Sequence, residues 1–174
     1  MKTNIHARKL IAYACLAVLA VAPARALADT ATFTAAPVSG CPDCAAKDTT
    51  GLVVYANGTL LPNGWDVKTS SSGLYIANRI GGYFKLPGKT FDLTGLKLFA
   101  TNVFSSTTAP VTYTLYAFHP GNPIADQVQV TINSRVVKDV PLTDTRLLNL
   151  DSVFVRFGSE IGYSYFIETR FTPH

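Results

Sequence analysis

Residues 111–119 read Val-Thr-Tyr-Thr-Leu-Tyr-Ala-Phe-His, and they alternate with the period of two that is typical of a β-strand. Successive side chains of a strand point to opposite sides. The alternation therefore places four residues on a single face: Val111, Tyr113, Leu115 and Ala117. We expect this face to pack on the core of a sheet protein.

Three other segments, residues 93–104, 152–157 and 164–171, alternate in the same way. In residues 93–104 the pattern puts Leu96, Leu98 and Ala100 on one face, with Lys97 and Phe99 on the other. In the last segment it predicts two faces, Tyr165, Ile167, Thr169 and Phe171 against Ser164, Phe166, Glu168 and Arg170. On this pattern Glu168 pairs with Arg170 or with solvent.

Asn133-Ser134 separates two strand-like runs, residues 127–132 and 135–140. Two polar residues between such runs indicate a β-hairpin. The register of that hairpin would set Val130 opposite Val137.

Between residue 29 and the end of the chain, about eight to eleven short strand-like runs recur with turn signals every 8–12 residues. No long window has the 3-and-4 spacing of a helix. The fold class that this pattern predicts is all-β: a single antiparallel β-sandwich, jelly-roll-like.

The first 28 residues have the three parts of a cleavable secretory signal peptide. Lys2, Arg8 and Lys9 supply positive charge, an apolar run follows over residues 10–21, and Ala26-Leu27-Ala28 ends the segment with small residues. The run is shorter than the ~20 residues of a membrane-spanning helix. We therefore expect one domain, residues 29–174, in a secreted, periplasmic or extracellular protein without a membrane span.

Much of the positive charge belongs to this leader. The whole chain has formal net charge +4, but four of its 15 Lys and Arg residues lie within residues 1–28. The remaining 11 balance the 11 Asp and Glu residues. A nucleic-acid partner requires a clustered basic face, and the basic residues here are scattered, so this function class is set aside.

Cys41 and Cys44 are the two cysteines outside the leader, in the motif Cys41-Pro42-Asp43-Cys44. An extracytoplasmic setting favours a disulfide that staples this loop. A redox role would need the first cysteine at a helix N-terminus, and no amphipathic helix follows. A zinc site would need two more ligands.

The stretches Gly81-Gly82-Tyr83-Phe84, residues 90–96 (Thr-Phe-Asp-Leu-Thr-Gly-Leu) and residues 150–155 (Leu-Asp-Ser-Val-Phe-Val) resemble strands of small secreted bacterial β-sandwich domains. These are the PEP-CTERM-associated domains, related in shape to galactose-binding-like jelly rolls. The resemblance covers roughly residues 64–171 and implies a jelly-roll fold in a matrix or carbohydrate-related setting. The end, Phe171-Thr172-Pro173-His174, lacks the sorting motif, so the sorting machinery is not implied.

The best cluster of aromatic and polar residues surrounds the single Trp of the chain. Aromatic rings stack on the C–H faces of sugars, while amide, carboxylate and guanidinium groups bond sugar hydroxyls. The predicted ligand-binding residues are Trp65, Asp66, Tyr75, Asn78, Arg79 and Tyr83. The competing interpretation is that Trp65 and Tyr83 belong to the core.

The segment Tyr116–Pro123 is a second candidate, because it leaves a strand and enters a loop, where binding residues often lie. Its Pro120, Gly121 and Pro123 are explained equally by a rigid turn. The turn is the favoured interpretation.

No catalytic, metal or phosphate motif stands out. A glycosidase uses two carboxylates, and the only Glu residues are Glu160 and Glu168. A serine nucleophile requires a His base, and His119 is the only candidate outside the leader and the C-terminus. Calcium is conceivable at four Asp residues, although each is better explained as a solvated or turn-capping side chain, so no cofactor is predicted: Asp126, Asp139, Asp144 and Asp151.

These observations favour a secreted, non-catalytic binding or matrix protein, with an extracellular polysaccharide as the expected partner. The first alternative is a structural surface protein that associates with itself through its Thr-, Ser- and Tyr-rich strand faces. The second is an enzyme that acts on glycans.

Overall fold

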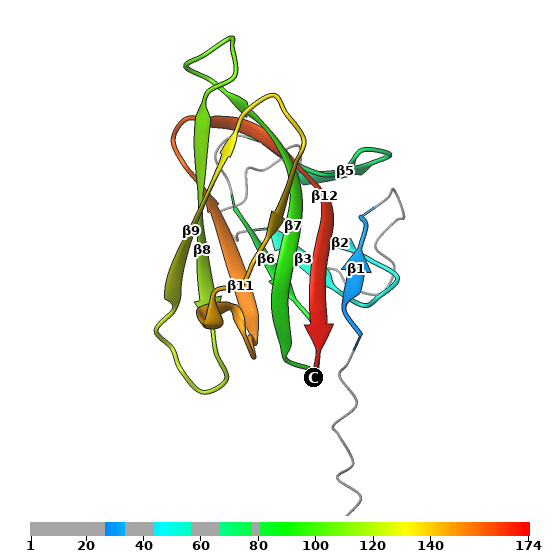
Figure 1. Cartoon of the computed structure of the whole chain (residues 1–174). Coiled ribbons are helices and arrows are strands. Elements are labelled where there is room, and N and C mark those ends of the chain that lie inside the picture. The colour runs from blue at the N-terminus through cyan, green and yellow to red at the C-terminus, as the bar shows by residue number, and fades with distance from the viewer. Residues whose placement is uncertain (1–26, 34–43, 57–66, 78–80) are drawn as a thin grey trace, which may run out of the picture.

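A computed structural model describes residues 27–33, 44–56, 67–77 and 81–174, and this part of the chain forms a β-sandwich (Figure 1). Twelve strands are described, with one short 3-10 turn, η1. Their bounds are β1 Asp29–Ala31, β2 Cys44–Lys47, β3 Val53–Ala56, β4 Val67–Ser70, β5 Gly73–Ala77, β6 Gly82–Lys85, β7 Phe91–Asn102, β8 Pro110–Phe118, β9 Asp126–Asn133, β10 Lys138–Pro141, η1 Thr145–Leu147, β11 Ser152–Phe157 and β12 Ile161–Pro173.

The strands form two six-stranded sheets in which every pairing is antiparallel. Sheet A has the order β10-β7-β12-β5-β4, with β1 added beside β12. Sheet B has the order β2-β3-β6-β11-β8-β9. From β5 onward, every connection except β8–β9 crosses from one sheet to the other. These crossings confirm the expected jelly-roll-like sandwich.

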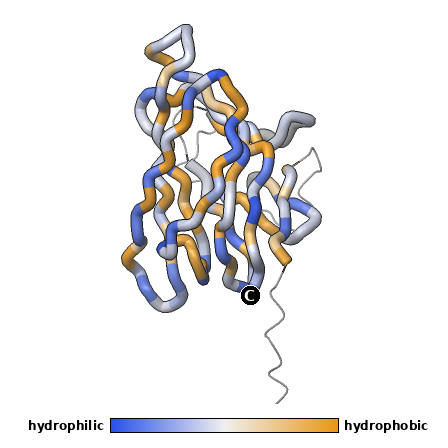
Figure 2. The backbone as a smooth tube through the Cα atoms, viewed as in Figure 1, coloured by the Kyte–Doolittle hydropathy of each residue, from blue (hydrophilic) through white to orange (hydrophobic). Residues whose placement is uncertain are grey.

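The core lies between the sheets and follows the alternation of the sequence. Apolar and polar residues alternate along the strands in Figure 2. Val111, Tyr113, Leu115 and Ala117 of β8 are fully buried, as the pattern predicted. The β7 residues predicted to share a face are buried as well, while Lys97 and Phe99 lie on the other side. Fully burying each of the large apolar side chains contributes about 1.5–3 kcal/mol, which makes this interior the main source of stability.

One polar contact joins the two sheets inside the core. The Ser164 hydroxyl of β12 donates to the Phe99 carbonyl at 2.9 Å and lies 2.7 Å from the Tyr113 hydroxyl of β8. Because Ser164 has one hydroxyl proton, Tyr113 must donate to the Ser164 oxygen. Burial raises the pKa of the Tyr113 phenol well above its ordinary value, so Tyr113 remains a neutral donor.

The predicted hairpin across Asn133-Ser134 is wrong. Strand β9 pairs with β8 in sheet B, whereas β10 pairs with β7 in sheet A. The chain crosses the sandwich at Ser134, which is fully buried and whose backbone N–H donates to the Ala109 carbonyl. Arg135 follows with φ of 59°, a left-handed conformation that turns the chain away from its own strand.

The two faces predicted for residues 164–171 are also wrong. The β12–β7 register shifts between Phe166 and Glu168, so the alternation changes phase at a β-bulge. As a result Ser164, Phe166, Thr169 and Phe171 are all buried. Glu168 consequently pairs with Lys97 at 2.8 Å rather than with Arg170.

Two predictions lie outside the described residues. One is the leader of residues 1–28, of which residues 1–26 are not described, and the other is the Cys41–Cys44 disulfide, because Cys41 is not described. Within the described ranges, no helix is long and apolar enough to cross a membrane.

Candidate functional site

The outer face of sheet B carries a row of aromatic side chains. In register across four neighbouring strands lie Tyr55 of β3, Tyr83 of β6, Phe154 of β11 and Tyr116 of β8. Each is half-buried and lies on the face of sheet B that points away from the core. We call these four residues the aromatic row.

Three of these rings contact one another across neighbouring strands. The ring centroids of Tyr83 and Phe154 are 4.7 Å apart with planes 29° apart, and those of Phe154 and Tyr116 are 6.0 Å apart with planes 35° apart. The first pair is stacked and the second is tilted, and both centroid distances lie in the range of about 4.5–7 Å that aromatic pairs prefer. This arrangement leaves ring edges and parts of the ring faces open to solvent.

Gly81 supports the centre of the row. A Cβ atom at this position would lie 2.1 Å from the Val155 carbonyl oxygen and 2.4 Å from a carbon of the Phe154 ring. The Phe154 ring therefore rests directly on the glycine backbone, which only a residue without a side chain permits.

Beside the row is a pocket of about 410 Å³. Its lining residues are Tyr83, Phe118, His119, Gly121, Asn122, Pro123, Asp151 and Ser152. In the register Ser152 lies between Lys85 of β6 and Phe118 of β8, so a short side chain separates two longer ones. This short side chain opens the hollow, which we call the Ser152 pocket.

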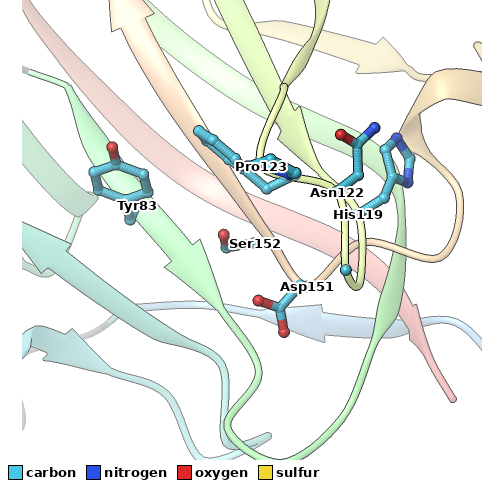
Figure 3. A pocket seen from close by; sticks show the side chains of 8 residues that line it. Tyr83, His119, Asn122, Pro123, Asp151 and Ser152 are labelled. Atoms are coloured by element: carbon cyan, nitrogen blue, oxygen red, sulfur yellow. The ribbon is translucent and has the colours of Figure 1, made fainter.

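Figure 3 shows Tyr83 on one side of the Ser152 pocket and the loop after β8 on the other, with Ser152 and Asp151 between them. The rings of Tyr83 and Phe118 have centroids 6.0 Å apart and both line the hollow. The pocket thus combines aromatic surface with a hydroxyl, a carboxylate and an amide.

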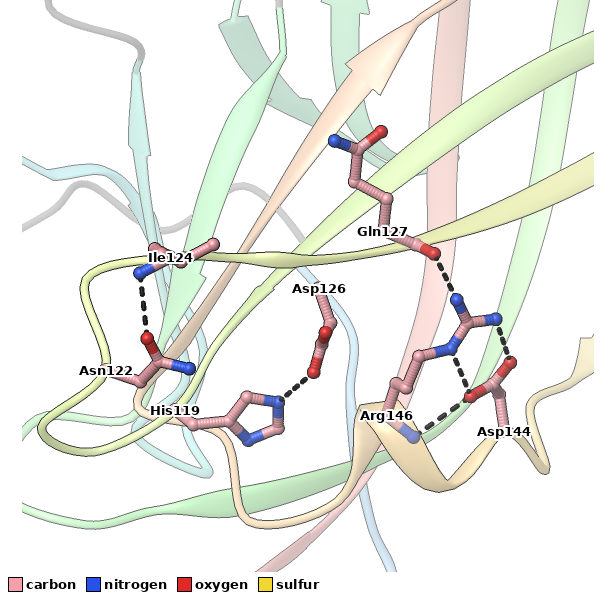
Figure 4. A network of polar contacts seen from close by, with 7 residues as sticks. All are labelled: His119, Asn122, Ile124, Asp126, Gln127, Asp144 and Arg146. Carbon is pink, nitrogen blue, oxygen red and sulfur yellow. Dashed lines mark hydrogen bonds and ion pairs between the residues drawn. The ribbon is translucent and has the colours of Figure 1, made fainter.

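Local hydrogen bonds hold the polar wall in place (Figure 4). The Asn122 side-chain oxygen accepts a hydrogen bond from the Ile124 backbone N–H at 3.0 Å. This bond uses the oxygen of the amide and not its nitrogen. His119 Nε2 lies 3.2 Å from an Asp126 carboxylate oxygen. The Asp151 carboxylate lies 3.6 Å from Lys85 Nζ.

A second network fastens the same end of sheet B. The Arg146 guanidinium donates to the Gln127 carbonyl at 2.7 Å, on the free edge of β9, and to both Asp144 carboxylate oxygens. These bonds from Arg146 lower the pKa of the Asp144 carboxyl to about 2. Figure 4 shows this Arg146–Asp144 network beside the His119–Asp126 contact.

The structure separates the two predicted site residues that it describes. Tyr75 lies on β5 in sheet A, and Tyr83 lies on β6 in sheet B, each half-buried on an outer face. They therefore belong to opposite sides of the sandwich, and Tyr83 is not a core residue. The other four predicted residues lie outside the described ranges: Trp65, Asp66, Asn78 and Arg79.

Sequence reasoning missed several residues of the site. Phe154 and Ser152 alternate with buried Val153 and Val155, a pattern that shows them pointing outward but not what they point beside. The segment Tyr116–Pro123 contains a turn, as favoured, and five of the eight pocket residues as well. What brings the parts together is the non-local pairing of β11 between β6 and β8.

Each Asp that was considered for calcium contacts a basic side chain. Asp126 lies beside His119, Asp144 pairs with Arg146, and Asp151 pairs with Lys85. Asp139 pairs with Arg170. Within the part of the chain that the structure describes, no three His, Cys, Asp or Glu side chains come together as a metal-binding group.

No family model matches this chain, and no curated protein matches it either. One similar solved structure is a mutant of CBM29-2, studied for ligand recognition by family 29 carbohydrate-binding modules. It shares 14% sequence identity, covers 86% of this chain and 93% of its own, and has a TM-score of 0.47. With so low an identity and TM-score, the ligand of this chain has to be argued from its own residues.

Proposed function

We propose that this protein binds an extracellular polysaccharide, without catalysis, at the Ser152 pocket and the adjoining aromatic row. The observation that carries the proposal is the pocket lining, in which the rings of Tyr83 and Phe118 lie beside the polar groups of Ser152, Asp151 and Asn122. Ligand sites in proteins combine apolar walls with a few polar groups that set orientation in this way.

The chemistry of a pyranose ring matches this lining. Its C–H faces are apolar and can lie against Tyr83 or Phe118, while its hydroxyls lie at the rim. The Ser152 hydroxyl both donates and accepts, the Asp151 carboxylate accepts, and the Asn122 amide nitrogen donates. The site therefore offers partners of both kinds for sugar hydroxyl groups.

The extracellular setting and the absence of turnover are further parts of the proposal. The setting is supported by the signal-peptide pattern of residues 1–28. Among the eight pocket residues Asp151 is the one carboxylate, whereas a glycosidase uses a pair. The resemblance to secreted bacterial jelly-roll domains is consistent with this setting.

The test compares matched aromatic variants on the two outer faces. We expect Tyr83→Ala and Phe118→Ala to weaken binding to an insoluble or gel-embedded polysaccharide by about tenfold, because each removes one wall of the pocket. Tyr165→Ala and Phe99→Ala, on the outer face of sheet A, should leave binding unchanged. Affinity electrophoresis against a panel of glycans measures all four, and melting curves verify that each variant folds.

Three outcomes would contradict the proposal. If no glycan in the panel retards the folded protein, binding is excluded, and concentration-dependent sedimentation would then support self-association instead. If the sheet A variants lose binding and the sheet B variants keep it, the site is misplaced. If a glycan is cleaved during incubation, the protein is an enzyme.

A further inference from the structure

From the charge pattern of sheet B we infer that the polysaccharide is acidic, and that Arg156 binds a sugar carboxylate beyond the aromatic row. This inference rests on the proposed function, because it names the ligand class of the same site. It concerns the outer face of β11, where Ser152, Phe154 and Arg156 follow one another at every second position.

These three residues define a path along β11. At about 3.3 Å per residue, the four-residue step from Ser152 to Arg156 spans about 13 Å, which is long enough for several sugar units. Ser152 is in the pocket, Phe154 is in the aromatic row, and Arg156 is exposed on the far side of that row. Val153, Val155 and Phe157 point into the core and fix the outward direction of the other three.

Arg156 is available for a ligand. Within the described ranges it forms no ion pair, whereas Lys85, on the opposite side of the row, is paired with Asp151. The register places Arg156 opposite Thr114, and Thr114 opposite Gln129, so its neighbours across the sheet are uncharged. Glu160, which follows on the same stretch of chain, instead accepts a bond from the Thr112 backbone N–H at 2.6 Å.

The surroundings favour an anion at this position. The four central strands of sheet B, namely β3, β6, β8 and β11, contain no Asp or Glu residue. The carboxylate of a sugar that stacks on the row could therefore pair with Arg156, because no acidic side chain on these strands competes for the guanidinium. The guanidinium fork matches a planar carboxylate with two parallel hydrogen bonds, which points to uronic acid units.

The decisive probe is a pair of polymers that share one sugar backbone and differ in whether the carboxylates are free or esterified. Polygalacturonate carries free carboxylates, and its fully methyl-esterified form presents the same backbone with the carboxylates neutralised. We expect the purified protein to bind polygalacturonate about tenfold more tightly than the ester, with an advantage that shrinks as salt is raised. Isothermal titration measures both.

Three variants locate the effect. Arg156→Gln should remove the preference for polygalacturonate while leaving the weaker binding of the ester unchanged. Arg156→Lys should retain part of the preference, since it keeps the charge and loses the fork. Lys138→Gln, an exposed cation on the edge of sheet A, is the matched control and should behave as wild type.

Equal affinity for the two polymers would overturn the acidic-ligand inference, and an Arg156→Gln variant that keeps the preference would overturn the assignment to Arg156. Both outcomes would leave polysaccharide binding standing. Binding to dextran sulfate but not to polygalacturonate would overturn the assignment to carboxylates. Failure to bind any glycan would instead refute the proposed function itself.

Discussion

Both outer faces of the sandwich carry clustered aromatic side chains, but the rings are packed differently. On sheet A, Phe99, Tyr163, Tyr165 and Tyr75 contact one another with planes 33–89° apart. On sheet B, the rings of Phe118, Tyr83, Phe154 and Tyr116 contact one another in sequence with planes 29–40° apart. The ring planes on sheet A thus span a wider range of angles, whereas the sheet B rings include two, Tyr83 and Phe118, that line a pocket.

The charges differ in the same sense. On sheet A, Lys97 is bonded to Glu168 at 2.8 Å, and Arg170 is bonded to Asp139. On sheet B, Arg156 stands without an acidic partner among the described residues. Both faces are therefore aromatic, and the proposed binding face differs from the other by the adjacent Ser152 pocket and by an arginine that has no ion pair among the described residues.

The largest expected effect compares two glycines, one behind each face. A Cβ at Gly81 would collide with the Val155 carbonyl oxygen, which is backbone and cannot move aside. A Cβ at Gly95 would meet only the guanidinium of Arg170, the far end of a flexible side chain. We expect Gly81→Ala to cost about 2–3 kcal/mol of unfolding free energy and Gly95→Ala less than about 1 kcal/mol, measured by urea denaturation.

Gly81→Ala should also weaken glycan binding in whatever fraction remains folded, because the Phe154 ring must leave its position. Equal destabilisation by the two substitutions would show that Gly81 is not a support of the aromatic row.

The next effect concerns the interior that both faces share. Ser164→Ala leaves the buried Tyr113 hydroxyl without an acceptor, which costs about 1–3 kcal/mol. Tyr113→Phe leaves Ser164 still bonded to the Phe99 carbonyl and should cost about 1 kcal/mol. Chemical denaturation should rank Ser164→Ala as the less stable variant, with glycan affinity unchanged in both. The reverse ranking would contradict the donor assignment.

A smaller effect distinguishes the ion pairs of the two faces. The Lys97–Glu168 pair is close and partly buried, while Lys85 and Asp151 are 3.6 Å apart and more exposed. Glu168→Gln should lower the unfolding free energy by about 0.5 kcal/mol at low salt, and Asp151→Asn by almost nothing. Denaturation at two salt concentrations tests this; a larger loss from Asp151→Asn would reverse the contrast between the faces.

The smallest effect on stability is expected at the Arg146–Asp144 network beside the edge of sheet B. The pKa of Asp144 is about 2 in the folded protein, below its ordinary value of 3.8. Its stabilising contribution is therefore fully present above about pH 4 and is lost as the pH falls through about 2. The melting temperature of Asp144→Asn should be lower than that of wild type at pH 7, and the difference should shrink as the pH falls through about 2. A constant difference across this range would show that the carboxylate is not responsible.

The fold was predictable because alternation is a local signal, as in residues 111–119 and 93–104. The bulge near Ile167 was not, since a single extra residue changes the phase of all that follows. The crossing at Ser134 was missed because a polar dipeptide suits a hairpin and a crossing equally. For the site, Tyr75 and Tyr83 are only eight positions apart in the sequence, yet β5 and β6 belong to different sheets. Closeness in sequence therefore predicted a cluster of these two residues, which strand pairing places on opposite sheets.

The most direct test of the central claim maps a bound oligosaccharide by NMR onto the two faces. The aromatic ring signals of Tyr83, Phe118 and Phe154 should shift with saturation, while those of Phe99, Tyr163 and Tyr165 should stay in place. Saturable shifts confined to the sheet A rings would contradict it, and so would an absence of shifts in any ring at saturating ligand.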